Sequence, residues 1–122
     1  MNKKILIVED DSFLQGLAST KLEKEGFTVT AASSGDDALK LLKTDVPDCI
    51  LLDLILPGMD GFEVLRNVRE AGATRAVPVI VFSNLSEDTD IKHAKDLGAT
   101  DYMIKSNFTL DELADRIKEL LK

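Results

Sequence analysis

Residues 49–61 read CILLDLILPGMDG, and this stretch decides the fold. Its apolar run at residues 50–52 shows no alternation with polar residues, which is typical of a strand buried on both faces in a parallel sheet. The Pro-Gly and Asp-Gly pairs that follow indicate turns. Asp60, with Glu63 three positions later, predicts the start of a helix. We therefore expect Asp53 at the carboxyl end of a central strand, where open α/β sheets bind ligands. A turn or capping role is the ordinary alternative for a single aspartate in this place.

The rest of the chain repeats the same alternation of strand and helix. Apolar strands are expected at residues 4–9, 27–32, 49–53, 78–83 and 100–105, with helices starting near Ser12, Ser34, Asp60, Glu87 and Thr109. Five such units predict an α/β fold of the flavodoxin-like type: a five-stranded parallel sheet in the order 2-1-3-4-5 with helices on both faces. Because no linker or change of composition interrupts the chain, we expect residues 1–122 to form a single domain.

Composition narrows the classes of function. The formal net charge is −7 and the pI is near 4.6, so direct binding to nucleic acid is not expected. No apolar run approaches the length of a membrane span, and the first residues do not resemble a signal peptide. We expect no membrane association and a cytoplasmic location. The single cysteine, Cys49, excludes an internal disulfide and is expected to pack as a small apolar residue.

Polar side chains stand at the carboxyl ends of four of the expected strands. They are Glu9 and Asp10 after the first strand, Asp53 after the third, Ser83 after the fourth and Lys105 after the fifth. Three carboxylates at close range raise one another's pKa values unless a cation lies between them. Such an all-oxygen cluster suits Mg²⁺, and a carboxylate beside the metal can attack phosphorus to give an aspartyl phosphate. The lysine and the hydroxyl would stabilise the phosphoryl oxygens. The pattern predicts phosphoryl transfer to Asp53.

The sequence resembles the receiver domain of two-component response regulators over its whole length, in particular the single-domain chemotaxis type. The resemblance rests on four motifs in the family's order: ILIVEDD at residues 5–11, LLDLILPGMDG at 51–61, PVIVFS at 78–83 and GATDYMIK at 98–105. It implies two-component phosphorelay signal transduction, in which Asp53 accepts a phosphoryl group from a phosphohistidine with Mg²⁺ as cofactor. It also implies that the protein is not an enzyme with an external substrate and catalyses only its own phosphorylation and dephosphorylation.

The resemblance further implies roles for single residues. Asp10 and Asp53 would bind Mg²⁺ directly, Glu9 would bind it through water, and the Ile55 backbone carbonyl would be a further ligand. Lys105 would pair with the phosphoryl group.

The implied switch involves a hydroxyl and an aromatic ring. Ser83 would hydrogen-bond the phosphoryl group, and its movement would be coupled to reorientation of Tyr102. The surface that changes would be formed by the fourth helix, the fifth strand and the fifth helix. The implied partners are a sensor histidine kinase or a histidine phosphotransfer protein, and a downstream effector protein.

Two departures from the family pattern carry their own expectations. Ser106 stands where the family usually has proline, and a non-proline cis bond costs about 2.5–4 kcal/mol, so we expect a trans Lys105–Ser106 bond. Ile55 and Leu85 occupy the positions that modulate access of the hydrolytic water in the family. Because both are aliphatic and neither can hold water by a hydrogen bond, we expect slow self-dephosphorylation.

Other functions fit less well. A haloacid-dehalogenase-type phosphatase needs a second acid two residues after the nucleophile, where this chain has Ile55. A flavin or nucleotide binder of the same fold class would need a Gly-rich or Ser/Thr-rich loop after the first strand. A receiver that retains only the fold is disfavoured because every chemical position is filled. His93, alone on a polar helix, is expected to be a solvated surface residue. Whether the chain is a natural single-domain receiver or part of a longer regulator stays open.

Overall fold

Five parallel strands form one sheet in the order β2-β1-β3-β4-β5 in the computed structural model, which describes residues 2–122. The strands are β1 (Lys4–Val8), β2 (Thr28–Ala32), β3 (Cys49–Leu52), β4 (Val79–Ser83) and β5 (Asp101–Ile104). This order confirms the fold class expected from the alternation of strand and helix.

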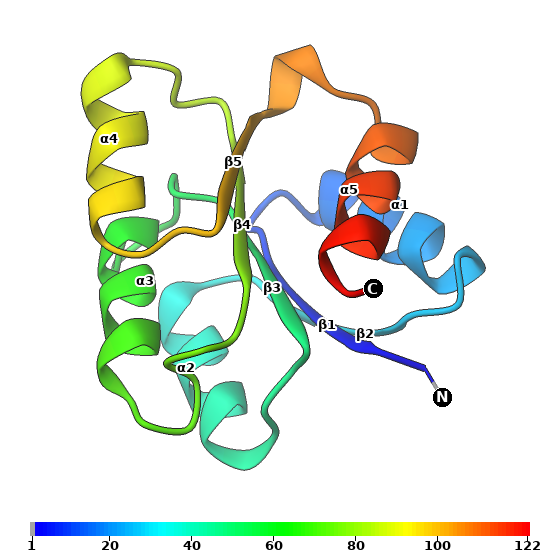
Figure 1. Ribbon diagram of the computed structural model, residues 1–122, viewed down its shortest axis with the longest axis horizontal. Coiled ribbons are helices and arrows are strands. Elements are labelled where there is room, and N and C mark those ends of the chain that lie inside the picture. Colours follow the sequence, from blue (N-terminus) through cyan, green and yellow to red (C-terminus); the bar gives the residue numbers. More distant parts are fainter. Residues whose placement is uncertain (1) are drawn as a thin grey trace.

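Helices cover both faces of the sheet. They are α1 (Ser12–Lys24), α2 (Gly35–Thr44), α3 (Gly61–Glu70), α4 (Asp88–Asp96) and α5 (Leu110–Leu120), with a single 3₁₀ turn, η1 (Lys105–Asn107), between β5 and α5. Figure 1 shows α2, α3 and α4 on one side of the sheet and α1 and α5 on the other.

The central strand β3 lies between β1 and β4, and all four of its residues are buried. Its last residue, Leu52, is level with Val8 of β1 and with Val81 of β4. Successive residues of a strand point to opposite faces, and each face packs against helices. This explains why the run is apolar without interruption. Because the strands end at nearly the same level, the residues that follow them meet at one edge.

Two apolar cores result, one on each face of the sheet. Leu6, Ile50 and Leu52 pack with the buried residues of α2, α3 and α4. Ile7, Leu51 and Phe82 pack with those of α1 and α5. Cys49 belongs to the second core as expected, and its burial raises the pKa of the thiol to about 12.

All five helices start within one residue of the expected position, but the cap of α1 differs from the expected one. Ser34 and Asp60 cap α2 and α3, and Thr109 forms a reciprocal capping box with Glu112 at α5. Ser12 is a residue type that can cap the helix after the first strand, but it is instead the first residue of α1, and the Asp11 carboxylate accepts from the N–H groups of Phe13 and Leu14. Aspartate and serine are both good N-caps, so two adjacent residues of these types do not show in the sequence which of them caps the helix.

The spacing of Leu14, Leu17, Ala18 and Leu22 predicts one apolar face on α1, and the face that is buried is narrower. Ala18 and Leu22 are buried, but Leu17 is 44% exposed and Phe13 is 75% exposed. The helix therefore contributes only part of its apolar surface to the core.

Two smaller expectations concern the backbone. No cis peptide bond occurs within residues 2–122, so the Lys105–Ser106 bond is trans as predicted, and the chain passes there into η1. Among these residues, no helix combines the length and apolar character that a membrane span requires.

Candidate functional site

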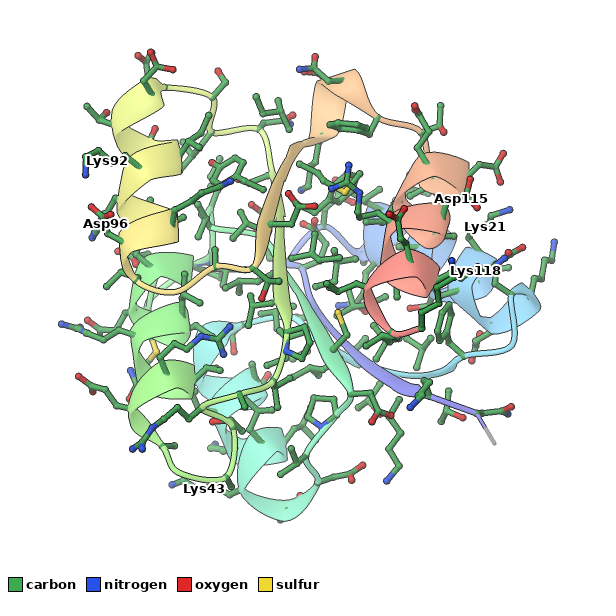
Figure 2. All side chains as sticks on the ribbon, viewed as in Figure 1. Lys21, Lys43, Lys92, Asp96, Asp115 and Lys118 are labelled. Atoms are coloured by element: carbon green, nitrogen blue, oxygen red, sulfur yellow. The ribbon has the colours of Figure 1, made fainter. Side chains whose placement is uncertain are left out.

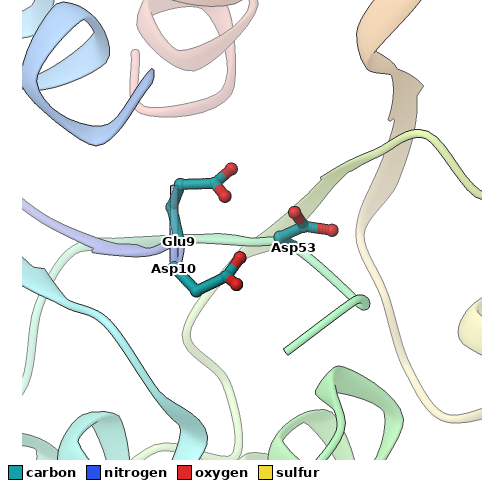
Figure 3. A group of neighbouring side chains, drawn as sticks. All are labelled: Glu9, Asp10 and Asp53. Atoms are coloured by element: carbon teal, nitrogen blue, oxygen red, sulfur yellow. The ribbon is translucent and has the colours of Figure 1, made fainter. Parts of the chain in front are cut away.

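Three carboxylates converge at the carboxyl edge of the sheet. Glu9 and Asp10 follow β1, Asp53 follows β3, and one oxygen from each lies within 4.8 Å of the others. Figure 3 shows the Asp10 and Asp53 side chains reaching toward the same space, with Glu9 beside them. Glu9 and Asp53 are each only 5% exposed, whereas Asp10 is exposed. The site is thus a buried pair of acids with a third acid at its mouth.

Lys105 supplies the positive charge of this cluster. Its Nζ donates to Glu9 Oε1 and to Asp53 Oδ2, both at 2.6 Å. Burial alone would lower the pKa of Lys105, but its hydrogen bonds to Asp53 and Glu9 outweigh that effect and raise it. Burial also raises the pKa of Glu9, against the opposing influence of Lys105. One ammonium facing three carboxylates leaves the cluster with excess negative charge.

The loop after β3 holds Asp53 in place. Its other oxygen, Oδ1, accepts from the Ile55 N–H at 3.0 Å, and the Gly61 N–H closes the loop on the Leu54 carbonyl at 3.0 Å. A Cβ on Gly61 would lie 2.5 Å from the Asp53 carbonyl oxygen and from the Leu54 Cα. Only glycine allows the start of α3 to approach the Asp53 backbone this closely.

Ser83 and Tyr102 meet at the backbone of Leu85. Ser83 is fully buried at the end of β4, and its Oγ accepts from the Leu85 N–H at 3.3 Å. The Tyr102 hydroxyl donates to the Leu85 carbonyl at 2.6 Å. Burial, and then the negative charges of Asp90 and Asp53, raise the pKa of Tyr102. The side chains expected to act together are therefore joined through one residue of the β4–α4 loop.

Residues 5–118 match the response regulator receiver domain family. The chain belongs to this family. The alkaline phosphatase synthesis transcriptional regulatory protein PhoP of Bacillus subtilis is 38% identical over 122 residues, which are all of this chain and 50% of PhoP. The chain thus spans about half the length of this curated relative.

Solved receiver structures have the same fold. The receiver domain of the Francisella response regulator 1452 is 32% identical with a TM-score of 0.90, covering 98% of this chain and 97% of the other. The chemotaxis protein CheY4 of Vibrio cholerae is 26% identical with a TM-score of 0.92, covering 99% and 100%. The chain is therefore a receiver domain of the two-component response regulators. This assignment is consistent with phosphorelay signalling, and the family is one of regulators and not a classical enzyme family.

The receiver's donor set suits a hard divalent cation. Carboxylate oxygens are the ligands that Mg²⁺ prefers, and the exposed position of Asp10 leaves room for water ligands. The Ile55 amide is committed to Asp53, while the role of the Ile55 carbonyl as a ligand stays a prediction.

Two features of the receiver had no distinct sequence signal. The Leu85 junction consists of backbone atoms, which any residue except proline can supply. His93 is exposed, as expected, but its ring stacks on Phe62 of α3. A contact between two helices depends on how the helices are placed, which spacing within one helix does not indicate.

Proposed function

We propose that this receiver takes a phosphoryl group from a phosphohistidine onto Asp53 in a Mg²⁺-dependent reaction and then changes its binding surface. The single observation that carries the proposal is the pair of 2.6 Å contacts from Lys105 Nζ to Asp53 and Glu9, with Asp10 beside them. A buried carboxylate next to one ammonium and two further acids is an unusual charge arrangement for a purely structural site.

The transfer makes one bond and breaks one. An Asp53 carboxylate oxygen attacks the phosphorus, the new O–P bond forms, and the N–P bond of the phosphohistidine breaks with its electron pair returning to the ring nitrogen. Lys105 already contacts Oδ2, so its ammonium can follow the negative charge onto the phosphoryl oxygens.

Glu9, Asp10 and Asp53 are the residues that would hold Mg²⁺, with the Ile55 carbonyl as a further ligand. Three carboxylates against one ammonium support a divalent cation at this site. When bound, Mg²⁺ would supply neutralisation of charge on the carboxylates and on the phosphoryl oxygens.

Ser83 and Tyr102 would carry the change from Asp53 to the surface formed by α4, β5 and α5. A rotation that carries the Ser83 Oγ toward a phosphoryl oxygen would move it away from the Leu85 N–H, and the Tyr102 contact to the same residue would be affected. Ala94 is the one buried residue of α4, so few core contacts hold this helix in place. A helix with few core contacts suits an element that moves.

The partners would be a sensor histidine kinase or a histidine phosphotransfer protein as donor and an effector protein as target, at a cytoplasmic location. Residues 1–122 would act as one receiver domain. The acidic charge of these residues disfavours direct contact with nucleic acid through this domain. PhoP, of which the matched residues make up 50%, is named a transcriptional regulatory protein.

The test is intact-mass analysis after incubation with acetyl phosphate, with and without Mg²⁺, for the wild type and Asp53→Asn. We expect one base-labile phosphoryl group that requires both Mg²⁺ and Asp53. Asp60→Asn is a matched control, because Asp60 is an exposed helix cap after the same strand. The absence of an adduct in every condition would favour a binding module that keeps the fold without the chemistry.

We also propose that the acyl phosphate is long-lived. Ile55 is 52% exposed and Leu85 is half-buried, and neither side chain can hold an attacking water by a hydrogen bond. Replacing Ile55 by Asn or Leu85 by Glu should shorten the lifetime of the phosphorylated protein, measured by loss of the mass adduct over time. A longer lifetime in both variants would contradict this explanation.

A further inference from the structure

An aromatic contact joins α3 to α4. The rings of Phe62 and His93 stack with centroids 4.4 Å apart and planes inclined by 16°. Phe62 is half-buried and packs against the core beneath α3, whereas His93 is exposed on α4. Figure 1 shows the two helices as neighbours on the same face of the sheet. The contact therefore ties the more exposed helix to the better-buried one.

Phe62 sits very close to the phosphoryl-acceptor loop along the chain. It follows Gly61, whose N–H donates to the Leu54 carbonyl and whose Cα abuts the Asp53 backbone. Little space separates the start of α3 from the segment that carries Asp53. The first turn of α3, which carries the ring of Phe62, is therefore in direct contact with that segment.

His93 lies where α4 has its main anchor. The next residue, Ala94, is fully buried, while the remaining described residues of α4 are exposed or only partly buried. The N-cap residue, Glu87, makes no side-chain capping bond. A helix with so few fixed points depends more than its neighbours on a single ring contact.

The surroundings of the ring pair allow it to separate. A groove of about 190 Å³ adjoins the pair, lined by Asp60, Phe62, Glu63, Arg66, His93 and Leu97. The ring pair therefore borders open space on one side, and packed side chains do not enclose it completely.

We propose that the Phe62–His93 stack is a second link between the Asp53 loop and α4, separate from the link through Ser83, Leu85 and Tyr102. The stack favours the position of α4 in this structure, and a change at Asp53 reaches α4 through the first turn of α3. The inference rests on the proposed function only in naming phosphorylation of Asp53 as the event that is passed on.

Hydrogen–deuterium exchange of α4 in the unmodified protein tests the contact itself. Phe62→Leu keeps the apolar packing and loses the ring, His93→Ala removes an exposed ring, and His93→Phe restores an aromatic surface. Since a stacked aromatic pair strengthens packing beyond its buried area, both losses should raise exchange in α4 by about 2- to 10-fold. The double variant should add nothing further, because a single contact is lost in each case. His93→Phe keeps an aromatic ring at this position, so exchange in α4 should be as slow as in the wild type. Lys95→Ala, an exposed α4 variant, should also leave exchange in α4 unchanged.

The same measurement with beryllofluoride, a phosphoryl mimic, tests the link. In the wild type, beryllofluoride should change the rate of exchange in α4. This change should be smaller in His93→Ala and in Phe62→Leu, and the part that remains should be carried by the link through Tyr102. Unchanged α4 exchange in both variants, or additive effects, would overturn the proposal, and so would an undiminished response to beryllofluoride. If beryllofluoride does not bind the wild type, which ¹⁹F NMR reports directly, the proposed function fails instead. The exchange rates of the variants measured without beryllofluoride still test the stack in that case.

Discussion

Replacing Lys105 by methionine tests the charge arrangement of the site directly. The substitution keeps an unbranched apolar stem and removes the ammonium that donates to Glu9 and Asp53 at 2.6 Å. Both acids are 5% exposed, so the variant leaves two buried carboxylates beside Asp10 with no counter-charge. Removing one partner of a buried ion pair costs about 3–5 kcal/mol. We expect the lower end, about 3 kcal/mol, because the site opens to solvent at Asp10.

Urea unfolding in a chelator gives the free energy directly, and a thermal scan should show a midpoint lowered by roughly 10 °C. A divalent cation that binds only the native state adds stability according to its affinity. Because the variant lacks a competing positive charge, Mg²⁺ should stabilise Lys105→Met more than the wild type.

Lys92→Met is the matched control. Lys92 pairs with Asp96 at 3.0 Å on the outer side of α4, where Figure 2 labels both residues, and both side chains are largely exposed. Such a pair contributes at most about 1 kcal/mol. If Lys105→Met cost no more than this control, or if Mg²⁺ stabilised it less than the wild type, the view of Lys105 as the counter-charge of a cation site would be refuted.

Four further outcomes follow from the same contacts. Without metal, Asp53→Asn should raise the thermal midpoint, since Lys105 keeps Glu9 as a partner while one of three mutually repelling carboxylates is removed; a lowered midpoint would contradict this. The pKa of Lys105 is higher in the folded protein than its usual 10.5, so its contribution to stability is fully present below that pH and lost as the pH rises further. The unfolding free energies of wild type and Lys105→Met should therefore converge above pH 10.5 in alkaline urea titrations. Arg69→Met should cost about 2–3 kcal/mol in urea unfolding, because the guanidinium donates to the carbonyls of Gly98 and Val77 at 3.0 and 2.7 Å, and Arg69→Lys should not fully restore it. Cys49, buried with a pKa of about 12, should react with a thiol reagent at pH 8 only at the rate of unfolding, and fast labelling of the native protein would count against its burial.

Much of the fold could be predicted because burial on both faces leaves a direct trace in sequence. The runs at residues 5–8 and 49–52 are continuous because helices pack on each side, and the acids follow where the strands end. Thr109 and Glu112 also indicated their helix start, since a capping box needs only local contacts. The sequence therefore predicts the buried strands, the acids that follow them and the capping box correctly.

Other features depended on placement between elements. The exposure of Leu17 follows from how α1 lies on the sheet, and its own spacing does not reveal it. Lys105 contacts both Glu9 and Asp53, and this double contact depends on where β5 ends relative to the other strands of the sheet. The Phe62–His93 stack needs the relative position of two helices. Spacing within one helix or strand therefore does not predict these contacts.

The junction at Leu85 has a consequence for how this receiver can vary. Ser83 and Tyr102 both bind main-chain atoms there, one the N–H and the other the carbonyl. Any residue with a backbone N–H can provide both contacts, and proline alone cannot. The side chain at position 85 is consequently free to change under selection for a shorter or longer signal, or for a different partner, while the connection between hydroxyl and ring stays intact. Under the proposed function, signal duration would depend on the side chain at position 85 and signal transmission on its main chain, so the two would be adjustable separately.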